Sequence, residues 1–136
     1  MDSKYLIGVP EMDEQHATIL KLVDRAKRVS GDEFEMNAVV MDLVSYAHSH
    51  LDQEEDFLKE NGLVDFEKEH SKKHVLFRAK AMEIYDQFRD AADIDIKKKI
   101  LYDIALFCEH WLIDHINVED RAYAVLLHKK AKINRQ

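Results

Sequence analysis

The chain has 136 residues, of which 46% are hydrophobic and 35% charged, and a formal net charge of −7. This length fits one compact domain with a hydrophobic core, and the proportion of hydrophobic to charged residues excludes a disordered chain. The acidic charge argues against a general nucleic-acid-binding protein. A single cysteine, Cys108, excludes an internal disulfide and a thiolate-rich metal site. Without a membrane-length apolar run or secretory-signal features in MDSKYLIGVP, we expect a cytoplasmic location and no membrane partner.

The first 30 residues divide into an arm and a helix. Gly8 and Pro10 place residues 1–12 in an N-terminal arm. Asp13 can cap a helix over about 13–30, which Ser30 and Gly31 end. Its inward face would carry His16, Ile19, Leu20, Val23 and Ala26.

Two long helices follow, over about 33–61 and 65–89. Asp32 and Glu35 resemble a capping box at the start of the first, and Asn61 with Gly62 supplies its stop. The first helix has an inward face of Met36, Val40, Leu43, Ala47, His50, Glu54 and Phe57. Asp65 can begin the second, whose inward face reads Phe66, His70, His74, Phe77, Ala81, Ile84 and Phe88.

The fourth helix is expected over about 94–128, after a turn at 90–93. It would present Ile100, Ile104, Cys108, Trp111, Leu112 and His115 inward. No strand pattern of comparable length competes with these four helices. Because short connections favour antiparallel neighbours, the sequence predicts an all-α, up-down-up-down four-helix bundle with an N-terminal arm, as one domain over 1–136.

Polar residues interrupt the apolar faces of these helices. Spacing alone is weak support for a site, because a pair such as His70 and His74 occurs by chance in roughly half of chains this rich in histidine. Burying several unpaired polar groups would cost several kcal/mol, which favours a shared metal centre over hydrogen-bonded core histidines. Nitrogen and oxygen donors in this ratio suit two first-row metal ions. The candidate ligands are His16, His50, Glu54, His70, His74, His115 and Asp120.

The same residues lie in motifs that resemble those of the hemerythrin family, in particular its bacterial members, the bacteriohemerythrins. The resemblance covers nearly the whole chain. Its elements are GVPEMDEQH around His16, HLDQEE from His50, HSKKH from His70 and WLIDHINVED from Trp111, in the expected order and separations.

This resemblance implies a non-haem diiron centre with an oxo or hydroxo bridge. It assigns His70, His74 and His115 to one iron and His16 and His50 to the other. Glu54 and Asp120 would bridge the two. The second iron then keeps an open position, which distinguishes a reactive centre from a structural one. The implied function is reversible dioxygen binding for oxygen storage, delivery or scavenging.

Three residues are expected to shape an oxygen pocket. Leu112 and Trp111 lie three and four residues before His115, and hence on its face. In the resembled family the leucine faces the dioxygen position and the tryptophan packs beside the site, although both also fit an ordinary core. Where the family commonly has phenylalanine after the second-helix histidine, this chain has Leu51, which is expected to enlarge the pocket and alter oxygen retention.

Asp120 poses a geometric problem. Five residues place it about 140° around a regular α-helix from His115, too far for both to face one centre. We therefore expect a local π-type turn between them, a feature common at functional sites.

Several residues near the motifs receive other interpretations. Tyr123 is expected to hydrogen-bond near the centre, and Cys108 to be a buried, inert thiol. Glu55 points about 100° away from Glu54 on an ideal helix, so we expect it to face solvent. The other histidines match no ligand position of the resembled family and are assigned to the surface or to the surroundings of the site: His48, His110 and His128.

Two other functional classes stay open at this stage. One is a diiron enzyme, such as a peroxidase, nitric oxide reductase or ferroxidase, although such oxidases generally use more carboxylates and fewer histidines. The other is an oxygen or iron sensor acting through a separate, unknown protein partner. The metal is likewise open, since five imidazoles also suit zinc, cobalt or manganese.

Overall fold

A computed structural model describes residues 5–134 of the chain. It contains helices α1 (Pro10–Lys27), α2 (Glu33–Glu60), α3 (Val64–Asp90) and α4 (Ile94–His115). A π-helical turn, η2 (Ile116–Asp120), joins α4 to a final helix, α5 (Arg121–Asn134). No strand occurs within the described residues.

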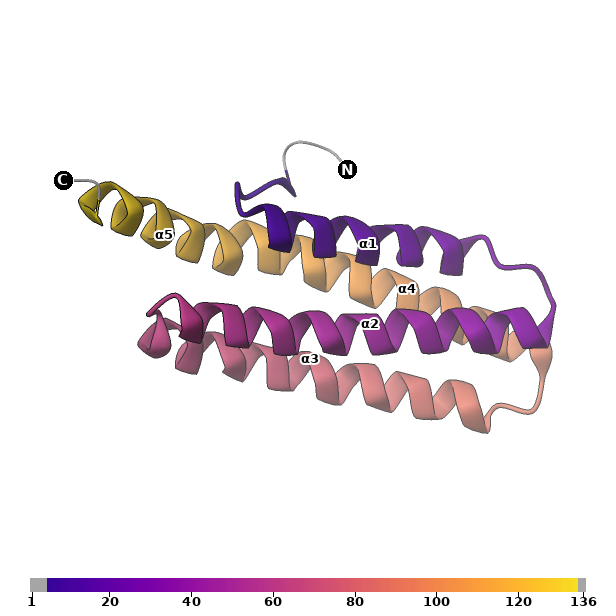
Figure 1. Ribbon diagram of the computed structural model, residues 1–136. Helices are drawn as coiled ribbons and strands as arrows, with labels where there is room; N and C mark the ends of the chain where they lie inside the picture. The colour runs from indigo at the N-terminus through magenta and orange to yellow at the C-terminus, as the bar shows by residue number, and fades with distance from the viewer. Residues whose placement is uncertain (1–4, 135–136) are drawn as a thin grey trace.

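The helices form the predicted antiparallel bundle. Each of α1 to α4 packs against its neighbours in the order α1, α2, α3, α4 and back to α1. Figure 1 shows the α1–α2 and α3–α4 connections at one end of the bundle and the α2–α3 connection at the other. Helix α5 continues the direction of α4 through η2. Among the described residues, no helix is both long enough and apolar enough to span a membrane.

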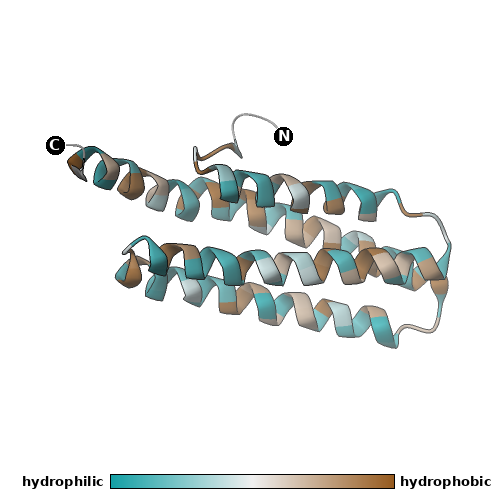
Figure 2. Ribbon diagram, in the orientation of Figure 1, coloured by the Kyte–Doolittle hydropathy of each residue, from teal (hydrophilic) through white to brown (hydrophobic). Residues whose placement is uncertain are grey.

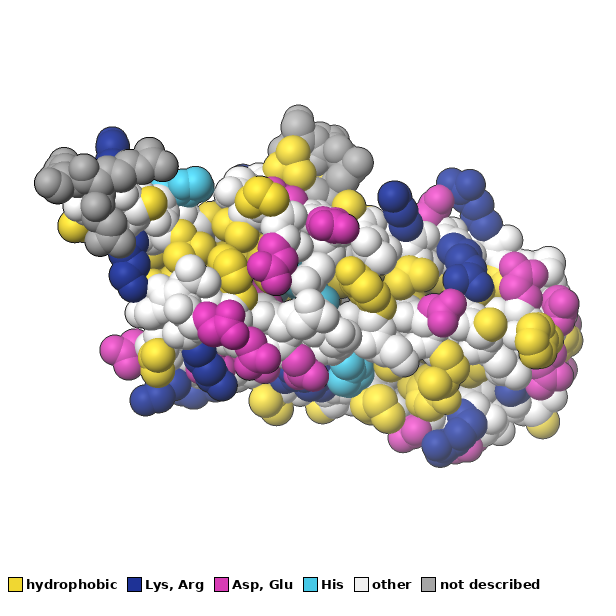
Figure 3. Space-filling model, viewed as in Figure 1, with side chains coloured by type: hydrophobic (Ala, Val, Ile, Leu, Met, Phe, Trp, Pro, Cys, Tyr) yellow, Lys and Arg dark blue, Asp and Glu magenta, His cyan; other side chains and the backbone are white. Residues whose placement is uncertain are grey.

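Each helix turns an apolar face inward. Figure 2 shows hydrophobic and hydrophilic residues alternating along every helix, as amphipathic helices require. On the face drawn in Figure 3, acidic and basic side chains are interspersed with apolar ones. In the half of the bundle near the α1–α2 connection, the core is made of apolar side chains, among them Val23, Met36, Val40, Leu43, Phe88, Leu101 and Ile104.

The start of α1 differs from the prediction. The arm was expected to reach residue 12, but the helix begins at Pro10. Proline suits the first helical position, because the N–H that it lacks would have no partner within the helix. Asp13 does not cap the helix; its carboxylate accepts hydrogen bonds from the backbone N–H groups of Ile7 (2.8 Å) and Gly8 (3.2 Å) and so holds the arm.

Other helix ends differ less. Helix α1 stops at Lys27 rather than at residue 30, and α3 starts at Val64 without a side-chain cap. The fourth helical segment was expected to end near 128, but α5 continues to Asn134, because no glycine or proline interrupts it. Asp32 caps α2 and Gly62, with a φ of 77°, follows its last turn, as predicted.

Candidate metal centre

All seven side chains predicted as metal ligands converge inside the half of the bundle near the α2–α3 connection. Every helix of the bundle contributes, and η2 adds the last carboxylate. None of the seven residues is more than 4% exposed. They are His16 from α1, His50 and Glu54 from α2, His70 and His74 from α3, His115 from the end of α4 and Asp120 from the end of η2.

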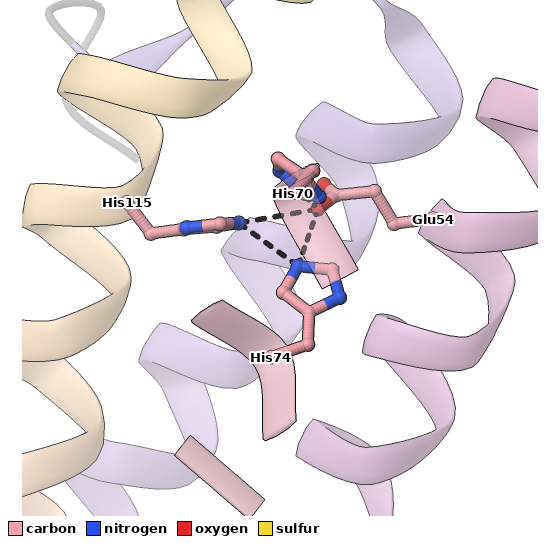
Figure 4. A group of neighbouring side chains, drawn as sticks. All are labelled: Glu54, His70, His74 and His115. Carbon is pink, nitrogen blue, oxygen red and sulfur yellow. Dashed lines mark hydrogen bonds and ion pairs between the residues drawn. The ribbon is translucent and has the colours of Figure 1, made fainter. Parts of the chain in front are cut away.

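Three histidines surround one oxygen of Glu54 (Figure 4). Glu54 Oε1 lies 3.2 Å from His70 Nε2, 3.2 Å from His74 Nε2 and 3.3 Å from His115 Nε2. The Nε2 atoms of His74 and His115 are themselves 3.0 Å apart. Ring nitrogens that converge in this way around a carboxylate can hold a metal ion.

The other oxygen of Glu54 faces two further histidines. Glu54 Oε2 lies 3.7 Å from His50 Nε2 and 3.9 Å from His16 Nε2. These three side chains form a second group that can hold a metal ion. Glu54 thus belongs to both groups.

Asp120 also reaches both groups. Its Oδ1 lies 3.2 Å from His70 Nε2 and 3.2 Å from His115 Nε2, while its Oδ2 lies 3.1 Å from His16 Nε2. Two carboxylates therefore stand between a group of three imidazoles and a group of two. This arrangement fits two metal ions that share bridging ligands.

Buried atoms without hydrogen-bond partners support the same reading. Among the described residues, His16 Nε2, His50 Nε2 and Asp120 Oδ2 are buried and make no hydrogen bond. The short approach of His16 to Asp120 is thus not a hydrogen bond. Each such atom costs about 1–3 kcal/mol when left unpaired, and a bound cation removes this penalty.

The pKa shifts of two ligands favour the charge states that metal binding needs, whereas the pKa of His70 is raised, because burial, which would lower it, is outweighed by the hydrogen bond to Asp120 and the charges of Glu54 and Asp120. Burial lowers the pKa of His50 to about 4, so its imidazole is neutral at pH 7. Burial alone would raise the pKa of Glu54, but hydrogen bonds from His115 and His74 hold it well below its ordinary value. A neutral imidazole and an ionised carboxylate are the forms that coordinate metals.

The turn between His115 and Asp120 is π-helical, as predicted. In a π turn the hydrogen bonds run between residues five positions apart, so a residue such as Asp120 lies close to the residue five positions before it, here His115. This wider turn lets both side chains face the same centre.

A small cavity adjoins His50. It has a volume of about 10 Å³ and is lined by Leu51, Trp111 and Leu112, the three residues predicted to shape an oxygen pocket, together with His50, Ile19, Ala47, Phe77 and Cys108. A space of this size holds about one water-sized molecule. Since His50 is the one predicted ligand in its lining, the cavity lies on the two-histidine side of the site. Trp111 also stacks on His115 of the other group, with ring centroids 4.3 Å apart.

A protein-family model for the hemerythrin HHE cation-binding domain matches residues 7–127. The chain belongs to the hemerythrin family. It is 27% identical over 120 residues to a bacteriohemerythrin of Stenotrophomonas maltophilia, covering 87% of this chain and 74% of that protein. The identity to a bacteriohemerythrin of Pseudomonas aeruginosa is 29% over 118 residues, or 85% and 72% of the two chains. A bacteriohemerythrin of Clostridium acetobutylicum is 24% identical over 132 residues, or 88% and 94%. No solved structure matches the chain significantly.

In two of the clustered histidines, His50 and His74, the ring nitrogen that faces away from the centre also makes a hydrogen bond. His50 Nδ1 donates to Gln15 Oε1 at 2.7 Å, and Gln15 Nε2 donates to Gln53 Oε1 at 2.8 Å. A proton on Nδ1 leaves the lone pair of Nε2 free for a metal. Gln15 was missed in the sequence, although it immediately precedes His16 within a quoted motif.

The expectation that Glu55 faces solvent is wrong. Its carboxylate Oε1 accepts from His74 Nδ1 at 3.2 Å, and its side chain is only 16% exposed. A rotation of about 100° from Glu54 turns Glu55 toward α3, because a bundle helix has neighbours on two sides. Arg78, one turn after His74, also contacts Glu55, and this i, i+4 spacing was the available signal.

Tyr123 occupies the predicted place near the centre. Its side chain is fully buried, and its hydroxyl donates to Glu54 Oε2 at 3.1 Å. The other histidines lie outside the cluster: His110 and His128 are exposed, and half-buried His48 contacts the backbone carbonyl of Val44 at 2.9 Å.

Proposed function

We propose that the protein binds dioxygen reversibly at a pair of iron ions held by the seven clustered side chains. The observation that carries the proposal is the unequal donor set. Three imidazoles on one side and two on the other share Glu54 and Asp120. The two-histidine position therefore has one protein donor fewer, which leaves room for an exogenous ligand.

The placement of the small cavity supports this proposal. It adjoins His50, which belongs to the position with fewer donors, and its other lining residues are hydrophobic except for the Cys108 thiol. A diiron pair would supply the electrons that dioxygen binding requires. The chain contributes a narrow, apolar space that suits a small neutral molecule and excludes bulk water.

Three side chains in or beside the cavity and the cluster are also poor proton donors at neutral pH. Burial raises the pKa of Cys108 to about 12 and moves the pKa of Tyr123 far above its ordinary value. His50, with a pKa lowered by burial to about 4, is uncharged at neutral pH. A cavity whose lining holds no ready proton donor favours release of dioxygen over its conversion to free hydrogen peroxide. We therefore propose a binding protein rather than an enzyme.

The test is an oxygenation cycle. The iron-loaded protein is reduced anaerobically, exposed to dioxygen and then flushed with argon while its visible spectrum is recorded. We expect an absorption band that appears with dioxygen, disappears on flushing and returns in a second cycle. Irreversible oxidation in the first cycle, with stoichiometric hydrogen peroxide in solution, would refute reversible binding.

Matched histidine variants test the site assignment. His50→Ala removes a donor of the two-histidine position, whereas His110→Ala changes an exposed histidine outside the cluster. We expect two iron ions per chain in His110→Ala and fewer than two in His50→Ala, measured by elemental analysis. Equal iron contents in the two variants would contradict the assignment.

A further inference from the structure

A chain of charged side chains supports His74 from outside the cluster. Glu55 Oε1 accepts from His74 Nδ1 at 3.2 Å. Arg78 donates from Nη1 to Glu55 Oε1 and from Nη2 to Glu55 Oε2, both at 3.2 Å. Arg78 Nη2 also donates to Asp52 Oδ1 at 2.6 Å. Both oxygens of Glu55 are thus held by one guanidinium, which fixes the carboxylate relative to the imidazole.

Glu55 forms a two-point ion pair with Arg78, with one guanidinium nitrogen on each carboxylate oxygen at 3.2 Å, and this pairing stabilises the ionised carboxylate. A carboxylate that accepts from Nδ1–H holds the proton on that nitrogen and makes Nε2 a more basic ligand. His74 Nε2 is the atom that faces Glu54 Oε1 inside the cluster, 3.2 Å away.

The two-histidine side has a different support. His50 Nδ1 meets the neutral amide of Gln15, which is bound to the neutral amide of Gln53. Gln53 in turn donates to the hydroxyl of Ser49 at 2.8 Å. On one side of the site the histidine therefore donates to a carboxylate paired with an arginine, and on the other side it donates to an uncharged amide. The two metal positions thus differ in more than the number of their histidines.

We propose that Glu55, aligned by Arg78, is a positioning residue that makes the three-histidine position the stronger metal site and lowers the reduction potential of a bound diiron pair. This inference rests on the proposed function. The ionised Glu55 increases electron donation from His74, which stabilises the more oxidised metal. His50 is supported only by neutral groups. The two-histidine position, which has room for an exogenous ligand, therefore has the weaker donor set.

Zinc titration of the metal-free protein, in competition with a chromophoric chelator, tests the binding part. We expect Glu55→Gln, which keeps the shape but removes the charge, and Glu55→Ala, which removes the acceptor, to weaken the tighter zinc site about 10- to 100-fold. Asp42→Asn is the matched control, since Asp42 also lies on α2 and pairs with an arginine, Arg25, at 2.9 Å, but contacts neither His74 nor the residues that support it. It should bind zinc within about twofold of the original protein.

Two further measurements, an NMR chemical shift and a reduction potential, distinguish a positioning role of Glu55 from a purely structural one. The Nδ1 proton of His74 in the zinc-loaded protein should move upfield in Glu55→Gln by histidine-selective NMR. The reduction potential of the iron-loaded variant should become more positive, while that of Asp42→Asn should not. Unchanged affinity, proton shift and potential in a folded Glu55→Gln would overturn the inference. If the original protein holds no pair of metal ions, the proposed function fails instead.

Discussion

Glu54 shows how much the surroundings of one residue decide. It is fully buried, a position that ordinarily favours the neutral acid, yet its pKa lies well below the ordinary value. Imidazoles on one side and the Tyr123 hydroxyl on the other stabilise the anion. A single carboxylate can then serve both histidine groups, because its two oxygens point in different directions.

Cys108 is the opposite case at the same scale. Burial raises its pKa to about 12, and no charged partner offsets this shift. Because the thiolate is the reactive form, the native thiol should stay neutral and unreactive until the pH approaches 12, whereas an ordinary cysteine ionises near pH 8.5.

Iodoacetamide labelling at pH 7 to 9 tests this prediction. We expect the native protein to react at least about 100-fold more slowly at pH 8.5 than the urea-unfolded chain, from the difference in thiolate fraction alone. The native rate should also remain far below that of a free thiol over this range. A native rate equal to that of the unfolded chain would show that Cys108 is accessible and ionisable.

At the scale of elements, η2 is the decisive feature. His115 ends α4 and Asp120 ends η2, and the π-helical turn brings the later side chain above the earlier one. A regular α-helix achieves the same stacking between residues four apart. His115 and Asp120 are five positions apart, one more than an α-helix allows for this stacking. Both can reach the centre only because the turn between them is the wider, π-helical kind.

Changing the length of this turn gives a sharp test. Val118 lies in η2 and is 65% exposed, so it makes little contribution to the core. Its deletion should give a regular α-helical turn that still aims Asp120 at the centre, with two iron ions retained per chain. Insertion of one alanine after Val118 should rotate Asp120 by about 100° and lower the iron content. Iron analysis showing the same content in both variants would contradict this account.

At the scale of the whole molecule, the bundle has two unlike halves. Apolar side chains fill the half near the α1–α2 connection, and the cluster of imidazoles and carboxylates lies in the other. Metal ligands come from every helix of the bundle, so a bound pair of metal ions would link all of them. Binding to the folded state alone should then stabilise the fold.

Metal removal should therefore lower the melting temperature. At a free metal concentration 100 times its dissociation constant, each site contributes about 2.7 kcal/mol, which corresponds to several degrees. Thermal unfolding followed by circular dichroism, with and without zinc, measures the difference. His50→Ala should show a smaller zinc-dependent increase than His110→Ala. An equal increase in both would mean that the metal acts elsewhere.

The helices, their inward faces and most of the metal ligands could be predicted from the sequence alone. Apolar residues repeating every three or four positions predict the four helices and their inward faces, and His50, His70, His74 and Glu54 interrupt those faces where buried ligands must lie. Even the π turn follows from the spacing of His115 and Asp120 once both must face one centre. These features depend on helix geometry, which is local.

The surroundings of the cluster required the tertiary structure. The sequence determined that Glu55 lies beside the inward face of α2, but only the packing of α2 on α3 decided that it meets His74 and Arg78 rather than water. The same holds for Gln15 of α1, which meets His50 of α2, and for the cavity bounded by residues of four helices. Helical periodicity sets the direction of a side chain on its own helix, whereas its partners depend on the rotation and approach of neighbouring helices, which no local spacing contains.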